Sequence, residues 1–144
     1  MKQMISAGLE ELGLTGCVPK DAPAQLAQYG RMLLEKNQVM NLTAIREPEG
    51  VTRLHFLDCA TLLKYCDFQG KTLIDVGTGA GFPGMVLKIL VPSLKVTLLD
   101  SLSKRLDWLT EVYEDLDGVS RSLSHCLEKA EIFIISRRFR LRLS

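Results

Sequence analysis

The stretch from Thr72 to Gly84, TLIDVGTGAGFPG, decides the fold of this 144-residue chain. Its first five residues form a short apolar run, which is typical of a buried strand in a parallel sheet. Glycines follow at Gly77, Gly79 and Gly81, and residues 82–90 then show a helical pattern, in which Pro83 is tolerated in the first turn. A strand that passes through a glycine loop into a helix indicates the first βα unit of an α/β fold.

A second strand and helix follow this unit. Pro92 and Ser93 interrupt the helical pattern, and residues 95–100, KVTLLD, form the next apolar run. Ser101 or Ser103 can cap a helix that extends to about residue 116. The order strand, glycine loop, helix, strand, helix predicts a doubly wound parallel sheet with right-handed crossovers.

The first 66 residues are expected to be helical. One helix is predicted over residues 22–38, and a second from Pro48, which suits a first helical turn, to about Cys66. The predicted buried face of the first helix carries Ala22, Leu26, Tyr29 and Leu33, and that of the second carries Val51, Leu54 and Leu62. We therefore expect a helical segment over residues 1–66, a βαβ core over residues 67–120 and a divergent basic tail over residues 121–144.

The glycine loop predicts a nucleotide-like ligand. Gly79, Gly81 and Gly84 fit G-x-G-x-x-G, a weak signal that its position between a strand and a helix strengthens. Asp75 precedes the first glycine by two residues, and its carboxylate would repel the pyrophosphate of a dinucleotide unless it pointed away. S-adenosylmethionine instead brings an α-amino group and a sulfonium, which a carboxylate favours. Alternatively, Asp75 accepts backbone hydrogen bonds at the end of the strand.

Asp100 closes the second strand, 23 residues after Gly77. An acidic residue about 20 residues beyond a glycine loop is placed to bind ribose hydroxyls. The alternative is that Asp100 caps the following helix. The sequence leaves both interpretations open.

Composition indicates a cytoplasmic protein. No apolar run approaches the about 18 residues of a membrane-spanning helix, and residues 1–6 do not resemble a signal peptide. The four cysteines and two histidines match no metal-binding spacing, so we expect no metal. Residues 1–120 carry 15 acidic and 12 basic side chains, whereas residues 121–144 carry two and six. This charge distribution gives no argument for a nucleic-acid partner.

Residues 73–84 and 96–105 together closely resemble the RsmG or GidB family of methyltransferases, whose members methylate N7 of a guanine in 16S rRNA. Upstream, residues 40–46, MNLTAIR, and residues 53–58, RLHFLD, are similar to two further motifs of that family. The resemblance extends over about residues 25–117. It implies a Rossmann-like class I methyltransferase fold, S-adenosyl-L-methionine as cofactor, and 16S rRNA or the 30S subunit as partner of a monomer.

The resemblance also implies roles for particular residues. The loop glycines Gly77, Gly79 and Gly81 and the side chain of Phe82 would line the cofactor site, and Asp100 would meet the ribose. Asn41, His55 and Asp58 would lie near the mouth of the pocket. His55 and Asp58 lie i, i+3 on a predicted helix and can touch, so a structural pair between them is the equal alternative. Guanine N7 already has a lone pair, so alignment can supply most of the catalysis without a strong general base.

The family pattern weakens after Gly118. Lys129-Ala130-Glu131 and Ser136-Arg137 are loosely similar to two later family motifs, which implies cofactor contacts at Ala130, Glu131 and Arg137. A complete doubly wound sheet needs more strands than residues 67–144 can hold, so we expect a truncated or frame-disrupted member. Two alternatives remain: an inactive cofactor-binding remnant, and an NAD-dependent oxidoreductase domain, which Asp75 disfavours.

Overall fold

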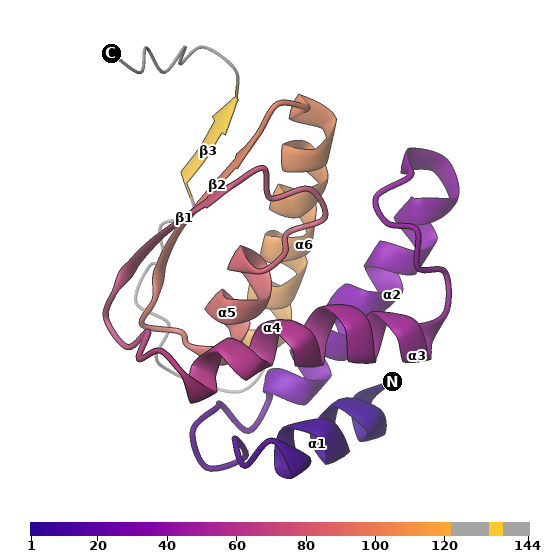
Figure 1. Ribbon diagram of the computed structural model, residues 1–144. Coiled ribbons are helices and arrows are strands. Elements are labelled where there is room, and N and C mark those ends of the chain that lie inside the picture. The colour runs from indigo at the N-terminus through magenta and orange to yellow at the C-terminus, as the bar shows by residue number, and fades with distance from the viewer. Residues whose placement is uncertain (122–132, 137–144) are drawn as a thin grey trace.

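A three-stranded parallel sheet forms one side of the computed structural model, which describes residues 1–121 and 133–136 (Figure 1). The strands are β1 (Thr72–Val76), β2 (Lys95–Asp100) and β3 (Phe133–Ser136), in the order β1-β2-β3. Asp75 lies opposite Leu98, which sets the two strand ends almost level. The two strands predicted from the apolar runs are confirmed at the predicted residues.

Helices α5 (Gly84–Leu90) and α6 (Ser103–Arg121) follow β1 and β2 and pack against the same side of the sheet (Figure 1). This arrangement follows because the chain advances in one direction across the sheet through crossovers of one hand. On the other side of β1, the side chains of Ile74 and Val76 are 61% and 71% exposed. The helix predicted over residues 82–90 is confirmed, and it begins two residues later than expected.

The N-terminal segment forms an outer layer of helices. It contains α1 (Lys2–Glu11), α2 (Ala22–Met40) and a third helical stretch. That stretch runs through α3 (Pro48–Val51), a π-helical turn (Thr52–Leu57), α4 (Asp58–Ala60) and a 3₁₀ turn (Thr61–Lys64). The helices predicted over residues 22–38 and from Pro48 onward are confirmed.

The buried faces of these helices match the sequence prediction in one case and differ in the other. All four residues predicted to face the core from α2, including Tyr29, are buried. In the third stretch Val51 is buried, but Leu54 and Leu62 are 63% and 37% exposed, so the predicted stripe is wrong there. The π-helical turn bonds i to i+5, so the residue that follows Val51 on the buried face is five positions later, Phe56. Ala60 is the next residue on that face, four positions after Phe56.

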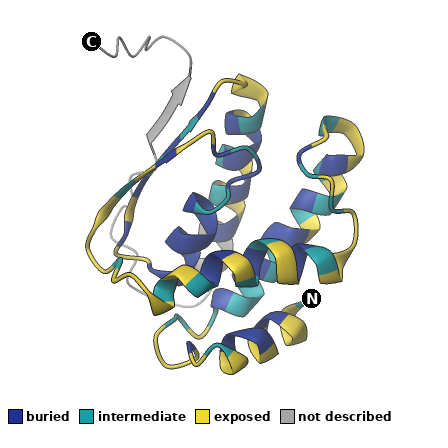
Figure 2. Cartoon of the chain, in the orientation of Figure 1, coloured by how far each residue is buried: buried dark blue, intermediate teal, exposed yellow. Residues whose placement is uncertain are grey.

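One hydrophobic core joins the helical layer to the sheet layer. Its largest fully buried side chains include Tyr29 of α2, Phe56 of the π-helical turn, Leu98 of β2 and Leu106 of α6. Figure 2 shows these elements turning their buried faces toward one another. Each such side chain contributes about 1.5–3 kcal/mol by leaving water. Within residues 1–121 and 133–136, no helix is long and apolar enough to cross a bilayer.

Candidate functional site

The glycine loop after β1 lies across the carboxyl end of β2. The backbone N–H groups of Gly77 and Thr78 both donate to the Leu99 carbonyl, at 2.7 and 3.0 Å, and Gly79 N–H donates to Asp100 Oδ2 at 2.8 Å. Three consecutive amides are therefore held by the last two residues of the neighbouring strand. The loop thus sits at the edge of the sheet where open α/β folds bind their ligands.

The backbone at Gly77 is open to approach. Its φ is +76°, and a Cβ placed there would meet no heavy atom within 4 Å. At the neighbouring Gly79 the nearest such atom is the Gly77 carbonyl oxygen at 3.9 Å. A ligand can therefore come close to this part of the main chain.

Gly81 faces the protein interior. Its φ is +99°, and a Cβ there would lie 2.8 Å from Leu109 Cδ2, 3.1 Å from Met85 Cβ and against the hydroxyl of Tyr29. A side chain at this position would displace packed core atoms. The lack of a side chain therefore matters for a different reason at each glycine. At Gly77 it leaves space for a ligand outside the loop, and at Gly81 it lets the loop pack closely against the core.

Asp75, at the end of β1, is buried beneath the loop. Its Oδ2 accepts hydrogen bonds from the Thr78 hydroxyl at 2.8 Å and from Gly84 N–H at 2.9 Å. The carboxylate thereby joins the start of the loop to the start of α5. The bond from Gly84 N–H fits the alternative interpretation, in which Asp75 accepts backbone hydrogen bonds at the end of the strand. A contact between Asp75 and the amino group of a cofactor stays a prediction.

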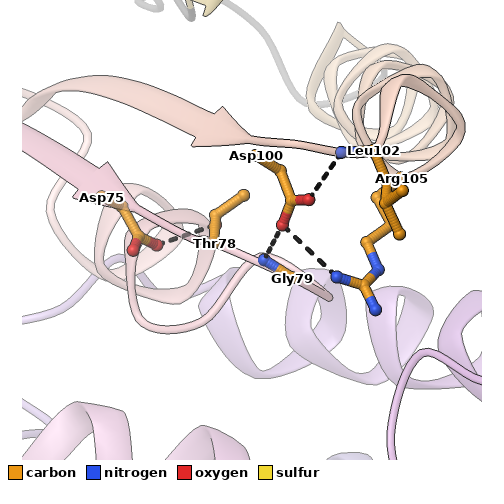
Figure 3. A network of polar contacts seen from close by, with 6 residues as sticks. All are labelled: Asp75, Thr78, Gly79, Asp100, Leu102 and Arg105. Carbon is orange, nitrogen blue, oxygen red and sulfur yellow. Dashed lines mark hydrogen bonds and ion pairs between the residues drawn. The ribbon is translucent and has the colours of Figure 1, made fainter. Parts of the chain in front are cut away.

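Asp100, at the end of β2, holds the loop from the other side (Figure 3). Its Oδ1 accepts the Leu102 N–H at 2.9 Å, and its Oδ2, which accepts the Gly79 N–H, also lies 3.6 Å from Arg105 Nη1. Burial alone raises the pKa of Asp100, but the backbone donors and the Arg105 cation outweigh it, so the pKa lies below its ordinary value. Asp100 is therefore a charged group that organises both the loop and the start of α6.

His55 joins the helical layer to the loop. Its ring stacks on that of Phe82, with centroids 4.3 Å apart and an angle of 17° between the planes, and its Nε2 lies 2.8 Å from the Thr43 hydroxyl oxygen. Burial lowers the pKa of His55, against the opposing influence of Asp58, so the ring is neutral at pH 7. In the described residues His55 forms no ion pair with the exposed Asp58, although the Asp58 charge still acts on the pKa of the ring.

Asn37 fixes the segment that holds His55. Its side-chain amide donates to the Thr43 carbonyl and accepts from the Thr43 N–H, both at 2.9 Å. Asn41, which ends α2 in a left-handed conformation with φ of +47°, is exposed and precedes Thr43 by two residues. The sequence prediction assigned no role to Asn37 or Thr43, although Thr43 lies within the family motif at residues 40–46.

Three other predictions fall outside the described part of the chain. Ala130, Glu131 and Arg137 are among residues 122–132 and 137–144, so their assignment to the cofactor site stays a prediction. Within residues 1–121 and 133–136, no group of three or more His, Cys, Asp or Glu side chains could hold a metal ion.

A parallel sheet with a glycine loop at its carboxyl edge and an acidic residue ending the next strand is a partial Rossmann-like fold, and the family match identifies it as that of a methyltransferase. The family model described as rRNA small subunit methyltransferase G matches residues 22–135. The chain belongs to this family.

Several curated proteins named ribosomal RNA small subunit methyltransferase G are similar to the chain. That of Alkaliphilus metalliredigens is 48% identical over 117 residues, which cover 80% of this chain and 48% of the relative. That of Bacillus pumilus is 42% identical over 135 residues, covering 91% and 54%, and that of Exiguobacterium sibiricum is 40% identical over 140 residues, covering 96% and 57%. The chain spans about half the length of the curated relatives it matches.

Proposed function

We propose that this chain carries the S-adenosylmethionine-binding part of a methyltransferase that modifies N7 of a guanine in 16S rRNA. The observation that carries the proposal is the open backbone at Gly77 and Gly79, beside the charged Asp100 at the carboxyl edge of the sheet. Membership of the rRNA small subunit methyltransferase G family supports both the cofactor and the RNA substrate.

The charges around the loop favour a cationic cofactor. Asp75 and Asp100 approach the loop from the ends of two neighbouring strands (Figure 3), and the described cation beside them, Arg105, is already paired with Asp100. Asp75 points inward to Thr78 and Gly84, so a ligand on the loop would feel its negative charge without touching it. Together with Asp100 it gives the loop a negative field, which repels a diphosphate and attracts a sulfonium and an ammonium group. This electrostatic arrangement supports S-adenosylmethionine over NAD.

Asp100 is also suited to bind ribose hydroxyls. An ionised carboxylate has about four lone-pair sites, and the described partners of Asp100 are the backbone N–H groups of Gly79, Ser101 and Leu102 and the Arg105 guanidinium. A ribose hydroxyl would therefore take the place of the Arg105 contact, which at 3.6 Å is the longest of those whose distances are known. The Arg105 side chain is 31% exposed and can turn aside when a hydroxyl approaches. Phe82, half-buried and stacked on His55, offers an apolar surface at the same loop.

The residues of this chain contribute by binding and alignment. When bound, S-adenosylmethionine would supply an electrophilic methyl group and leave as S-adenosylhomocysteine, and guanine N7 offers a lone pair that needs no prior deprotonation. The loop, Asp100 and Phe82 would orient the donor, and the ring of His55, stacked on Phe82, would keep Phe82 in place. Correct alignment of nucleophile, methyl and sulfur can supply most of the rate enhancement.

Isothermal calorimetry with S-adenosylhomocysteine and NADH, followed by transfer of a radioactive methyl group to 30S subunits or 16S rRNA, tests the proposal. We expect S-adenosylhomocysteine to bind and NADH not to bind. Binding without methyl transfer would leave the cofactor assignment standing and remove the catalytic one. Absence of S-adenosylhomocysteine binding by folded protein, or tighter binding of NADH, would refute the proposed cofactor.

A further inference from the structure

A fully buried tyrosine hydroxyl supports the glycine loop from below. Tyr29 of α2 has no exposed surface, and its ring lies among Phe56, Phe82 and Trp108, with centroid distances of 5.4, 5.8 and 6.2 Å. At the end of this ring the hydroxyl donates a hydrogen bond to the carbonyl of Ala80. Ala80 is the residue between Gly79 and Gly81, at the centre of the loop.

The hydroxyl is a permanent donor in this position. Burial raises the pKa of Tyr29 well above its ordinary value, and the nearby Cys59 and Asp75 add to the effect. The phenol therefore keeps its proton at neutral pH and can donate a hydrogen bond. A buried hydroxyl without a partner is costly, so the bond to Ala80 is the contact that allows a tyrosine in this apolar cluster.

The same hydroxyl also lies directly against Gly81. An added Cβ at Gly81 would meet the Tyr29 hydroxyl oxygen first, ahead of the apolar atoms around it. From the other side, the Leu99 carbonyl and Asp100 hold the amides of Gly77, Thr78 and Gly79. The loop is thus fixed between the strand ends and Tyr29.

We propose that Tyr29 is a positioning residue, whose O–H to Ala80 hydrogen bond holds the glycine loop in its ligand-binding shape and couples helix α2 to the cofactor site. The inference rests on the proposed function, because it assumes that the open face of the loop receives S-adenosylmethionine. Tyr29 is fully buried, so it acts on a bound ligand through the loop.

The test compares Tyr29→Phe, which removes the hydroxyl alone, with Ile5→Val, which trims a buried side chain of α1. Tyr29→Phe is expected to weaken binding of S-adenosylhomocysteine about tenfold, since one buried hydrogen bond no longer fixes the loop. It should also speed hydrogen exchange at the Gly81 and Phe82 amides. Ile5→Val should lower the stability and leave both readouts unchanged. A Tyr29→Phe variant that changes neither readout overturns the inference.

Two further measurements keep the role of Tyr29 testable if the chain does not bind S-adenosylhomocysteine or if the variant does not fold. If the unmodified chain does not bind S-adenosylhomocysteine, the proposed function fails, and the loop exchange of Tyr29→Phe alone decides whether Tyr29 positions the loop. If Tyr29→Phe does not fold, fluorotyrosine labelling of the unmodified chain decides. The fluorine signal of Tyr29 should then shift when S-adenosylhomocysteine is added, whereas that of Tyr65, which is 83% exposed, should not. An unshifted Tyr29 signal would contradict the coupling.

Discussion

Alanine substitutions at Gly77 and Gly81 should separate ligand binding from folding. Both residues have positive φ, at +76° and +99°, which costs about 1–2 kcal/mol for a residue with a Cβ. At Gly81 the new methyl would also press on Leu109 and Met85, at 2.8 and 3.1 Å, and overpacking of this kind costs about 1–3 kcal/mol. Gly81→Ala should therefore lose about 2–5 kcal/mol of unfolding free energy.

Gly77→Ala should lose about 1–2 kcal/mol, since its methyl meets no atom within 4 Å. That methyl would project into the space proposed for the cofactor, so binding of S-adenosylhomocysteine should weaken about tenfold or more. Gly13→Ala is the matched control, because Gly13 has φ of +73°, no atom within 4 Å of its Cβ position, and lies in the turn after α1. It should show the backbone cost without any loss of affinity.

Urea unfolding followed by tryptophan fluorescence measures the stabilities, and calorimetry at a temperature where each variant is folded measures the affinities. The reasoning is refuted if Gly81→Ala is no less stable than Gly13→Ala, because the packing against Leu109 and Met85 would then cost nothing. It is equally refuted if Gly77→Ala binds S-adenosylhomocysteine as tightly as the unmodified chain.

Three further predictions concern titratable groups. Because the pKa of Asp100 is lowered by folding, its charge should stabilise the fold above about pH 4. The difference in unfolding free energy between the unmodified chain and Asp100→Asn should therefore shrink as the pH falls below that value. The pKa of His55 is also lowered by folding, so the unfolded chain binds the proton more readily and the stability again falls as the pH falls. Relative to His55→Asn, the unmodified chain should lose stability as the pH falls through about 6.5, the ordinary pKa of histidine, and an NMR titration of His55 with a midpoint above about 6.5 would contradict this. Burial raises the pKa of Cys59 to about 12, so iodoacetamide should label the exposed Cys17 and Cys66 and spare Cys59 in the native chain, as peptide mass spectrometry would show.

The position of His55 shows where prediction from local pattern fails. The sequence predicted a helix from Pro48 onward, and the helix is present, but the π-helical turn at Thr52–Leu57 changes which side chains face the core. His55 consequently pairs with Thr43 and stacks on Phe82, although its spacing suggested contact with Asp58. Hydrophobic periodicity assumes one helical geometry throughout, so it cannot reveal a change of helix type.

The sequence by itself determined strands β1 and β2, the glycine loop, and the acidic residues Asp75 and Asp100 near the ends of these strands. These features are encoded locally, because an apolar run, a set of glycines and a chain break each follow from the preferences of neighbouring residues. The family motifs over residues 40–105 likewise needed no structure. The direction in which Asp75 and Asp100 point, however, could not be read from their positions along the chain.

Only the tertiary structure decided how the loop is held. Asp75 points inward and accepts hydrogen bonds from Thr78 and Gly84. Asp100, at the end of the next strand, accepts one from the Gly79 N–H. Tyr29, in a helix more than 50 residues earlier, donates one to the Ala80 carbonyl. In the sequence Tyr29 is one apolar-face residue among several on α2. Its hydroxyl bonds Ala80 because helix packing places this buried donor beside a buried carbonyl. Such a contact depends on the tertiary structure and cannot be predicted from the order of the residues.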